Sequence, residues 1–225
     1  MPRPRRVFLP RVSLHIIQRG NNKCTSFIDA SDCEAFLDLV RLVSDQYPFA
    51  VHGFSLMTTH YHMVATPADE NAAPAAMQYL DGNYSKYFNR RYGRIGRLWN
   101  GPYRGIHILD ERYWLTCLRY VEQNPVRAQM VARADAYRWS SCRFHTTGVG
   151  PDWLVPHPLY LGLGATPVER QIAYKAICNV PLTDDELGLV RHVRCQARYK
   201  SFTNPRAEPA WYRAAGSISP PCSRS

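Results

Sequence analysis

The chain has 225 residues, 45% of them hydrophobic, and its 28 Lys and Arg against 18 Asp and Glu give a formal net charge of +10. This length and apolar content fit one ordinary domain with an appendage, or two small domains, around a real core. The arginine-rich positive charge favours a polyanionic partner, because guanidinium groups match phosphate oxygens.

The cysteines and the N-terminus argue against several classes of protein. The 7 cysteines are scattered, their number is odd and no two form a C-x-x-C pair. This pattern is not that of a zinc knuckle or a disulfide framework, and it favours a reduced, cytoplasmic location. We find no signal peptide, and no stretch approaches the roughly 20 apolar residues that span a bilayer. We therefore expect no membrane partner.

The N-terminal part of the chain predicts a strand followed by a helix. Residues 12–18 have the composition of a strand, and residues 19–22 that of the turn after it. Ser31 and Glu34 form a capping box, in which each side chain can satisfy a backbone amide of the other residue. The helix that this box opens should end before Pro48.

The next segments continue the alternation of strands and helices. Residues 50–56 and 60–66 predict two strands that are close enough in sequence to pair as a hairpin. A helix is expected over 74–93 and a strand over 105–109. A further helix is expected over 110–124, where Asp110 caps its start and the following proline ends it.

This order of elements predicts an α+β fold. The first six elements match a ferredoxin-like βαββαβ sheet with helices on one face. We expect a main domain over 1–147 and a small helical C-terminal extension over 148–202, whose helices should span roughly 167–178 and 184–198. The stretch 203–225 is basic and rich in Pro and Ser, which predicts a disordered tail.

His60 and His62 are candidate metal ligands. In a strand, residues two apart share a face, so both imidazoles should lie side by side while Tyr61 points the other way. Neighbouring neutral imidazoles suit a divalent metal. The alternative is two half-buried strand histidines bound to backbone carbonyls, and a short H-x-H pattern alone favours that alternative.

Tyr120 and Asn124 form a second candidate group, four residues apart on one face of the predicted helix. That face lies beside the apolar stripe, so Tyr120 is not an obvious core residue. Two ordinary roles remain open at this point. Tyr120 can be a partly buried tyrosine at a helix edge, and Asn124 can simply close the helix before Pro125.

Together these residues resemble the single-tyrosine HUH transposases, and most closely the REP-associated tyrosine transposases. The resemblance covers about residues 5 to 145. It is carried by the motifs Arg19-Gly20-Asn21-Asn22, Met57-x-x-His60-Tyr61-His62, Asn83-Tyr84-x-x-Tyr87-Phe88-Asn89-Arg90-Arg91, Gly101-x-Tyr103, Arg119-Tyr120-Val121-x-x-Asn124-Pro125-Val126-Arg127-Ala128 and Trp139-Ser140-Ser141.

The resemblance implies a chemistry and a role for each residue. The domain over 1–147 would be a catalytic domain that cleaves and rejoins single-stranded DNA next to hairpins through a covalent 5′-phosphotyrosine. Tyr120 would be the nucleophile, His60 and His62 the metal ligands, and Asn124 a third ligand or a positioner of the metal. The family implies Mg²⁺ or Mn²⁺, although imidazole ligands lean towards Mn²⁺ or heavier ions.

The implied partners are single-stranded hairpins of the REP-like palindrome type. Phosphate contacts are expected from the basic residues Arg5, Arg6, Lys86, Arg90, Arg91, Arg94, Arg104 and Arg127. Tyr84 and Tyr87 offer faces for unpaired bases, although at helical spacing such aromatics are more often core residues. The family leaves open whether the protein acts as a monomer or a homodimer.

Two other functions compete with this prediction. The first is a catalytically inactive regulator that binds hairpin DNA, against which the intact set His60, His62, Tyr120 and Asn124 argues. The second is a metal-dependent nuclease that uses water, but the predicted strands carry few of the carboxylates that two-metal chemistry needs.

Overall fold

The computed structural model describes residues 8–196. The strands are β1 (Leu14–Arg19), β2 (Phe49–Met57), β3 (His60–Pro67) and β4 (Arg104–His107). The helices are α1 (Ala30–Gln46), α2 (Ala72–Arg91), α3 (Glu111–Glu122), α4 (Asn124–Arg127), α5 (Cys142–Thr147), α6 (Pro158–Leu161), α7 (Pro167–Cys178) and α8 (Asp184–Gln196), with 3₁₀ turns at Asn21–Lys23 and Ala134–Ala136.

The four strands form one antiparallel sheet in the order β2-β3-β1-β4. The hairpin partner β3 lies between β1 and β2, because the α1 crossover leaves room for it. The predicted ferredoxin-like α+β fold is therefore confirmed. The register places Ile17 of β1 opposite His62 of β3, and Arg19 opposite His60.

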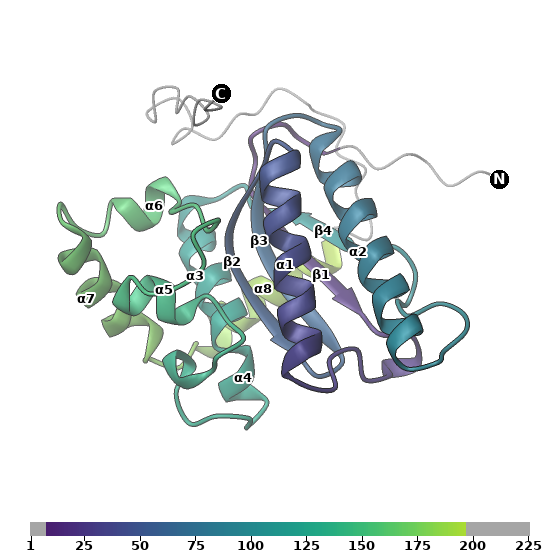
Figure 1. The fold of residues 1–225 in the computed structure, drawn as a ribbon. Helices are drawn as coiled ribbons and strands as arrows, with labels where there is room; N and C mark the ends of the chain where they lie inside the picture. The colour runs from purple at the N-terminus through teal and green to yellow at the C-terminus, as the bar shows by residue number, and fades with distance from the viewer. Residues whose placement is uncertain (1–7, 197–225) are drawn as a thin grey trace.

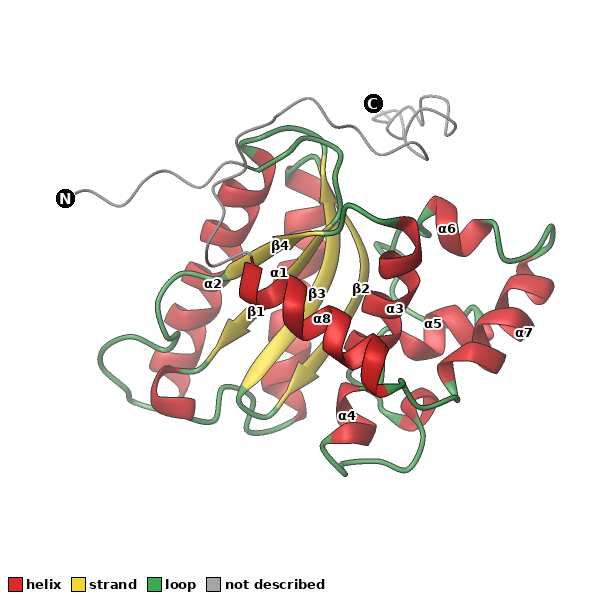
Figure 2. Cartoon of the chain, turned by 180° about the vertical axis from the view of Figure 1, so that it is seen from behind, coloured by secondary structure: helices red, strands yellow, loops and turns green. Residues whose placement is uncertain are grey.

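Each face of the sheet is covered by a different set of helices (Figures 1 and 2). As predicted, α1 and α2 lie together on one face, above Leu14, Ile16, Tyr61 and Met63. The opposite face is covered by α3, which packs against β2 and β3, and α8 lies on this side as well. The sheet is thus buried on both sides, which explains the nearly continuous burial of β2 and β3.

The start of α1 differs from the prediction. Asp29, not Ser31, caps the helix, and its carboxylate accepts the Asp32 amide at 3.2 Å. Glu34 instead accepts a hydrogen bond from Arg138 at 3.0 Å. The predicted capping box at Ser31 is therefore wrong. Asp29 lies two residues before Ser31, so α1 begins two residues earlier than predicted.

The later helices agree more closely with the sequence. The capping boxes at Thr166 and Thr183 are both formed, with reciprocal bonds to Glu169 and Glu186. The short helices α4, α5 and α6 were not predicted, since four to six residues carry too little periodicity.

The domain boundary at 147/148 stays a prediction. The structure ends α5 at Thr147 and has Gly148 in the left-handed conformation, with φ of 75°. The predicted tail over 203–225, and with it Arg5 and Arg6, lies outside the described residues. Within residues 8–196, no helix combines the length and hydropathy needed to cross a bilayer.

Candidate active site

β3 carries its histidines and its tyrosine on opposite faces of the sheet. The rings of His60 and His62 lie together on the α3 side, with centroids 5.1 Å apart. Tyr61 points to the α1 and α2 side, where its hydroxyl donates to Asp81 at 2.7 Å. His60 and His62 therefore point to the same face of the sheet, as the alternation of side chains along a strand requires.

A third histidine, which the sequence analysis missed, joins this pair. His15 lies on the adjacent strand β1, and its Nε2 is 2.9 Å from Nδ1 of His62. Their ring centroids are 5.1 Å apart. The strand over 12–18 was recognised, but its pairing with β3 is a long-range contact that local sequence does not reveal.

Tyr120 lies beside these histidines within the same chain. The centroid of its ring is 5.8 Å from that of His62 and 5.8 Å from that of His15. Its side chain is buried, with 5% of its surface exposed. The helix α3 thus holds the phenol against the imidazoles, and no second copy of the chain is needed to bring the two groups together.

The position of Tyr120 follows from how α3 packs on the sheet. The apolar stripe of α3, including Trp114, Leu118 and Val121, is fully buried against β2 and β3. The backbone of β2 is close at this point, because a Cβ on Gly53 would lie only 2.4 Å from Cδ1 of Leu118. This close approach brings the edge of the helix, and Tyr120 with it, down onto the histidines.

Two further predicted residues contact Tyr120. The guanidinium of Arg127 lies over the tyrosine ring, 4.8 Å from its centroid. Asn124 donates from its amide to the backbone carbonyl of Tyr120 at 3.4 Å. Arg127 is therefore part of the candidate site, whereas the amide of Asn124 contacts the end of α3.

The donor chemistry of this cluster fits a divalent metal. His62 faces His15 through Nδ1, so it would ligate a metal ion through Nε2. A metal-bound imidazole commonly has its other nitrogen held by a neighbouring polar group, which fixes the ring. His60 and His62 would hold the ion, and His15 would orient His62.

Arg104 lies on the same face of the sheet as the histidines. It pairs with Ile17 on β1, and Ile17 pairs in turn with His62. Directly opposed residues of antiparallel strands share a face, so Arg104 is two strands away from His62, or roughly 10 Å. Arg19, which the sequence analysis did not select, is opposite His60 on this face.

The basic residues of α2 lie on the other side of the sheet. Lys86 and Arg90 are exposed there. Arg91 is paired with both Asp29 and Asp32 at 2.7 Å, so its charge is already neutralised within the protein. The guanidinium of Arg94 lies over the Phe88 ring, 5.5 Å from its centroid.

The two tyrosines of α2 belong to the packing of the helical layer. Tyr84 is fully buried and donates to the Ser26 carbonyl at 2.7 Å. Tyr87 lies against α1, with its hydroxyl 3.3 Å from the Asp32 carboxylate. Tyr84 is therefore a core residue, and the ordinary reading of this aromatic stripe holds for it.

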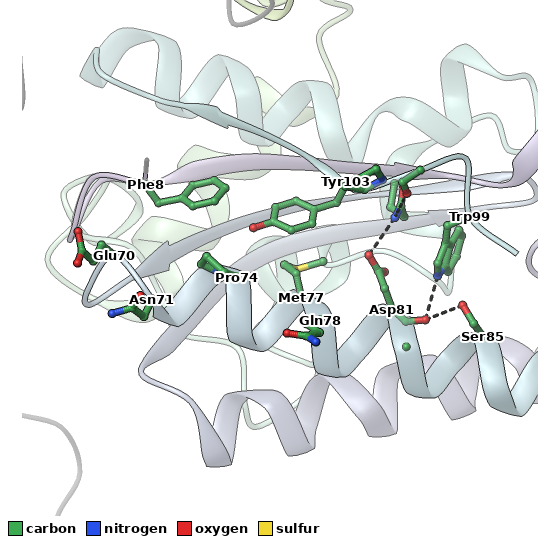
Figure 3. Close-up of a pocket in the computed structure, with 14 residues that line it drawn as sticks. Phe8, Glu70, Asn71, Pro74, Met77, Gln78, Asp81, Ser85, Trp99 and Tyr103 are labelled. Atoms are coloured by element: carbon green, nitrogen blue, oxygen red, sulfur yellow. Dashed lines mark hydrogen bonds between the residues drawn. The ribbon is translucent and has the colours of Figure 1, made fainter. Parts of the chain in front are cut away.

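A cavity of about 580 Å³ lies on the α2 side of the sheet (Figure 3). Phe8 and Tyr103 stack at 5.9 Å along one wall, opposite Met77 of α2. Asp81 accepts from Gln18 at 2.9 Å, and burial raises the pKa of this carboxyl to about 7. The cavity is separated from Tyr120 by the sheet, so it is not the place where the histidines and the tyrosine meet.

The class of the protein follows from a family model that covers the sheet and α3. The family model described as "Transposase IS200 like" matches residues 9–124, which is more than half of the chain. The chain therefore belongs to the IS200-like transposase family, whose members process DNA. A search among curated proteins found no match.

One solved structure shares the fold, and two others give weaker matches. A REP-associated tyrosine transposase bound to a REP hairpin matches with a TM-score of 0.54 and 15% identity, over 70% of this chain and 93% of that one. A candidate transposase from Deinococcus radiodurans has a TM-score of 0.38 and 15% identity, over 58% and 92% of the two chains. The tRNA(His) guanylyltransferase of Saccharomyces cerevisiae has a TM-score of 0.40 and 11% identity, over 81% and 84%.

Proposed function

We propose that this protein cleaves and rejoins single-stranded DNA next to hairpins through a covalent tyrosine–DNA intermediate. The observation that carries the proposal is the contact of Tyr120 with His62 and His15, at 5.8 Å between ring centroids. A buried phenol beside His62 would place the nucleophile next to one proposed metal ligand, and His60 lies on the same face of the sheet.

The chemistry follows from the two kinds of side chain. The Tyr120 oxygen attacks the phosphorus of a phosphodiester, the bond to the 3′ oxygen breaks, and that oxygen leaves as a 3′-hydroxyl. The 5′ phosphate stays on the tyrosine. A 3′-hydroxyl from another DNA end then reverses the step, so the bond energy is conserved and joining needs no external energy source.

A divalent ion, Mg²⁺ or Mn²⁺, belongs to this proposal. His60 and His62 would hold it and Asn124 would be the third group near it. When bound, such an ion polarises a phosphate oxygen and stabilises the leaving oxygen. Arg127, over the Tyr120 ring, would bind the phosphate that the tyrosine attacks.

We assign the DNA path to the face that carries the histidines. Arg104 and Arg19 flank the histidine pair on this face. The structurally similar REP-associated transposase was solved with a REP hairpin, which supports hairpin DNA as the partner. Lys86 and Arg90 on α2 would contact a more distant part of the DNA backbone, whereas the ion-paired Arg91 is a weaker candidate.

Substitution of the proposed nucleophile tests the proposal. Hairpins from the flanks of the gene are incubated with the protein, with and without Mn²⁺, and a protein–DNA adduct is sought on a denaturing gel. Tyr120→Phe should abolish the adduct while hairpin binding survives. Tyr113→Phe, a buried tyrosine on the same helix, is the matched control and should keep the adduct.

The same assay separates the two competing functions. A hairpin-binding regulator would bind tightly and give no metal-dependent cleavage with any strand, and the burial of Tyr120 is the observation that favours this candidate. A nuclease that uses water would still cleave DNA with multiple turnovers when it carries the Tyr120→Phe substitution. An adduct that persists in Tyr120→Phe would place the nucleophile elsewhere.

A further inference from the structure

A second group of metal-ligating side chains lies on the far side of α3 from Tyr120. Glu122 of α3, Cys142 of α5 and Cys178 of α7 bring one carboxylate oxygen and two sulfur atoms within 4.8 Å of one another. The two sulfur atoms are 3.2 Å apart. All three side chains are buried. Nothing in the proposed DNA chemistry uses them.

The carboxylate of this group is held by three donors. Ser141 donates its hydroxyl to Glu122 at 2.5 Å, His145 lies at 2.7 Å through Nδ1, and Tyr174 donates at 2.7 Å. Burial and the nearby carboxylate keep the pKa of Tyr174 well above its usual range, so its phenol remains a donor. Carboxylates that bind a metal are commonly oriented by such outer hydrogen bonds.

Charge favours a cation among these residues. Within residues 8–196, the ion-pair partner of the fully buried Glu122 is His145, and no Lys or Arg reaches it. A buried carboxylate is costly unless it is compensated. With both cysteines as thiolates, the three ligands carry three formal negative charges, and a divalent ion would offset two of them.

Thiolate ligands form when thiols lose their protons, so metal binding would release protons from this site.

The ligand atoms select the kind of ion. Two sulfur atoms and one carboxylate oxygen suit Zn²⁺, which accepts mixed sulfur and oxygen ligands, whereas Mg²⁺ and Mn²⁺ prefer oxygen. The site would therefore discriminate against the ion that the histidine cluster is proposed to use.

We propose that Glu122, Cys142 and Cys178 bind a zinc ion that fastens α7 of the C-terminal extension to α3 and α5. The binding free energy of such an ion would add to the stability of the fold. The ion would hold the extension in place behind the helix that carries Tyr120. This zinc site does not depend on the proposed DNA cleavage, because none of its three ligands takes part in that reaction.

Metal analysis of the purified full chain tests the proposal. Protein prepared with a reductant and without chelator should hold roughly one zinc per chain by elemental analysis. Cys142→Ser combined with Cys178→Ser should lose it. Cys33→Ser, a buried cysteine outside the group, should keep it. His60→Ala with His62→Ala should keep it too, which separates this site from the proposed active site.

Cobalt gives a readout that does not depend on how well a variant folds. Wild-type protein loaded with Co²⁺ should show the near-ultraviolet absorption of thiolate-bound cobalt. The proposal is overturned by protein that takes up no zinc under reducing conditions, by zinc retained in the double cysteine variant, or by a Cys142–Cys178 disulfide, which mass spectrometry would detect as a loss of two hydrogen atoms.

Discussion

His15 is the residue that most changes the picture of the histidine cluster. Its Nε2 faces Nδ1 of His62 at 2.9 Å, so it is placed to fix the ring that would bind the metal. We expect His15→Phe to raise the Mn²⁺ concentration needed for half-maximal adduct formation by roughly 10–100-fold, since outer-shell partners of metal ligands have effects of this size. A metal titration of the adduct rate measures it.

The conservative variant separates positioning from a general loss of structure. His15→Gln introduces a side-chain amide that can hydrogen-bond to His62, so this variant should recover part of the Mn²⁺ affinity. If His15→Phe lowered the rate at saturating Mn²⁺ and left the half-maximal concentration unchanged, His15 would not act through the metal.

Arg127 gives a second prediction at the scale of one side chain. Its guanidinium is 4.8 Å from the centre of the Tyr120 ring, where it would hold the ring and bind the phosphate that Tyr120 attacks. Arg127→Ala should slow adduct formation in single-turnover measurements by roughly 5–30-fold, the equivalent of about 1–2 kcal/mol of a partly buried cation–π contact. Arg127→Lys should restore part of the rate. Equal rates in all three proteins would remove Arg127 from the site.

The residue-level predictions from sequence succeeded where a motif is local. The alternation of His60, Tyr61 and His62 followed from strand geometry alone, and it is present in the structure. Local sequence did not reveal the ion pairs of Arg91, because their partners lie on α1, about 60 residues earlier in the chain. Long-range pairing accounts for His15 in the same way.

At the scale of elements, the packing of α3 on β2 determines where Tyr120 lies. Gly53 permits this packing, since a Cβ there would be 2.4 Å from Leu118. Gly53→Ala should lower the free energy of unfolding by about 1–3 kcal/mol through overpacking and should also slow adduct formation. Urea denaturation and the adduct assay measure the two effects.

Gly82 offers a matched control for this substitution. A Cβ on Gly82 of α2 meets no atom within 4 Å, and the residue lies inside a helix. Gly82→Ala should therefore raise the free energy of unfolding by roughly 0.5–1 kcal/mol. Gly53→Ala with unchanged stability and unchanged adduct rate would show that α3 does not need this close approach.

Helix boundaries were predictable where the capping chemistry is unambiguous. Thr166 and Thr183 each have one glutamate three residues later, and both boxes form. Around α1 two candidates compete, and Asp29 prevails over Ser31 because its carboxylate also pairs with Arg91. Which residue caps α1 depends on a contact with Arg91 of α2, and the local sequence around α1 does not reveal that contact.

For the whole molecule, buried histidines predict a loss of stability in mild acid. Burial lowers the pKa of His52 and His107 to about 4 and that of His157 to about 2. A histidine in the unfolded chain has a pKa near 6.5. Below that pH these histidines are therefore protonated in the unfolded chain but remain neutral in the folded chain. The free energy of unfolding should therefore fall as the pH decreases from 7.

Asp81 opposes this trend but does not cancel it. Its raised pKa of about 7 means that the folded chain gains a proton first, which favours folding at lower pH. Three histidines outweigh one carboxyl, and the net loss between pH 7 and pH 5 should be on the order of 3 kcal/mol. Urea denaturation at both pH values measures it. His52→Gln should reduce the loss, and equal stability at pH 5 and pH 7 would contradict the prediction.

Tyr120 and His62 meet within one chain, and this has a kinetic consequence. The first cleavage step should be first order in protein, and its rate per molecule should not decline on dilution. Co-expressed Tyr120→Phe copies would compete with active copies for DNA ends. They would not inactivate those copies by forming mixed oligomers, because each chain carries a complete site. The dose of inactive protein needed to silence an active copy would then be set by DNA occupancy alone.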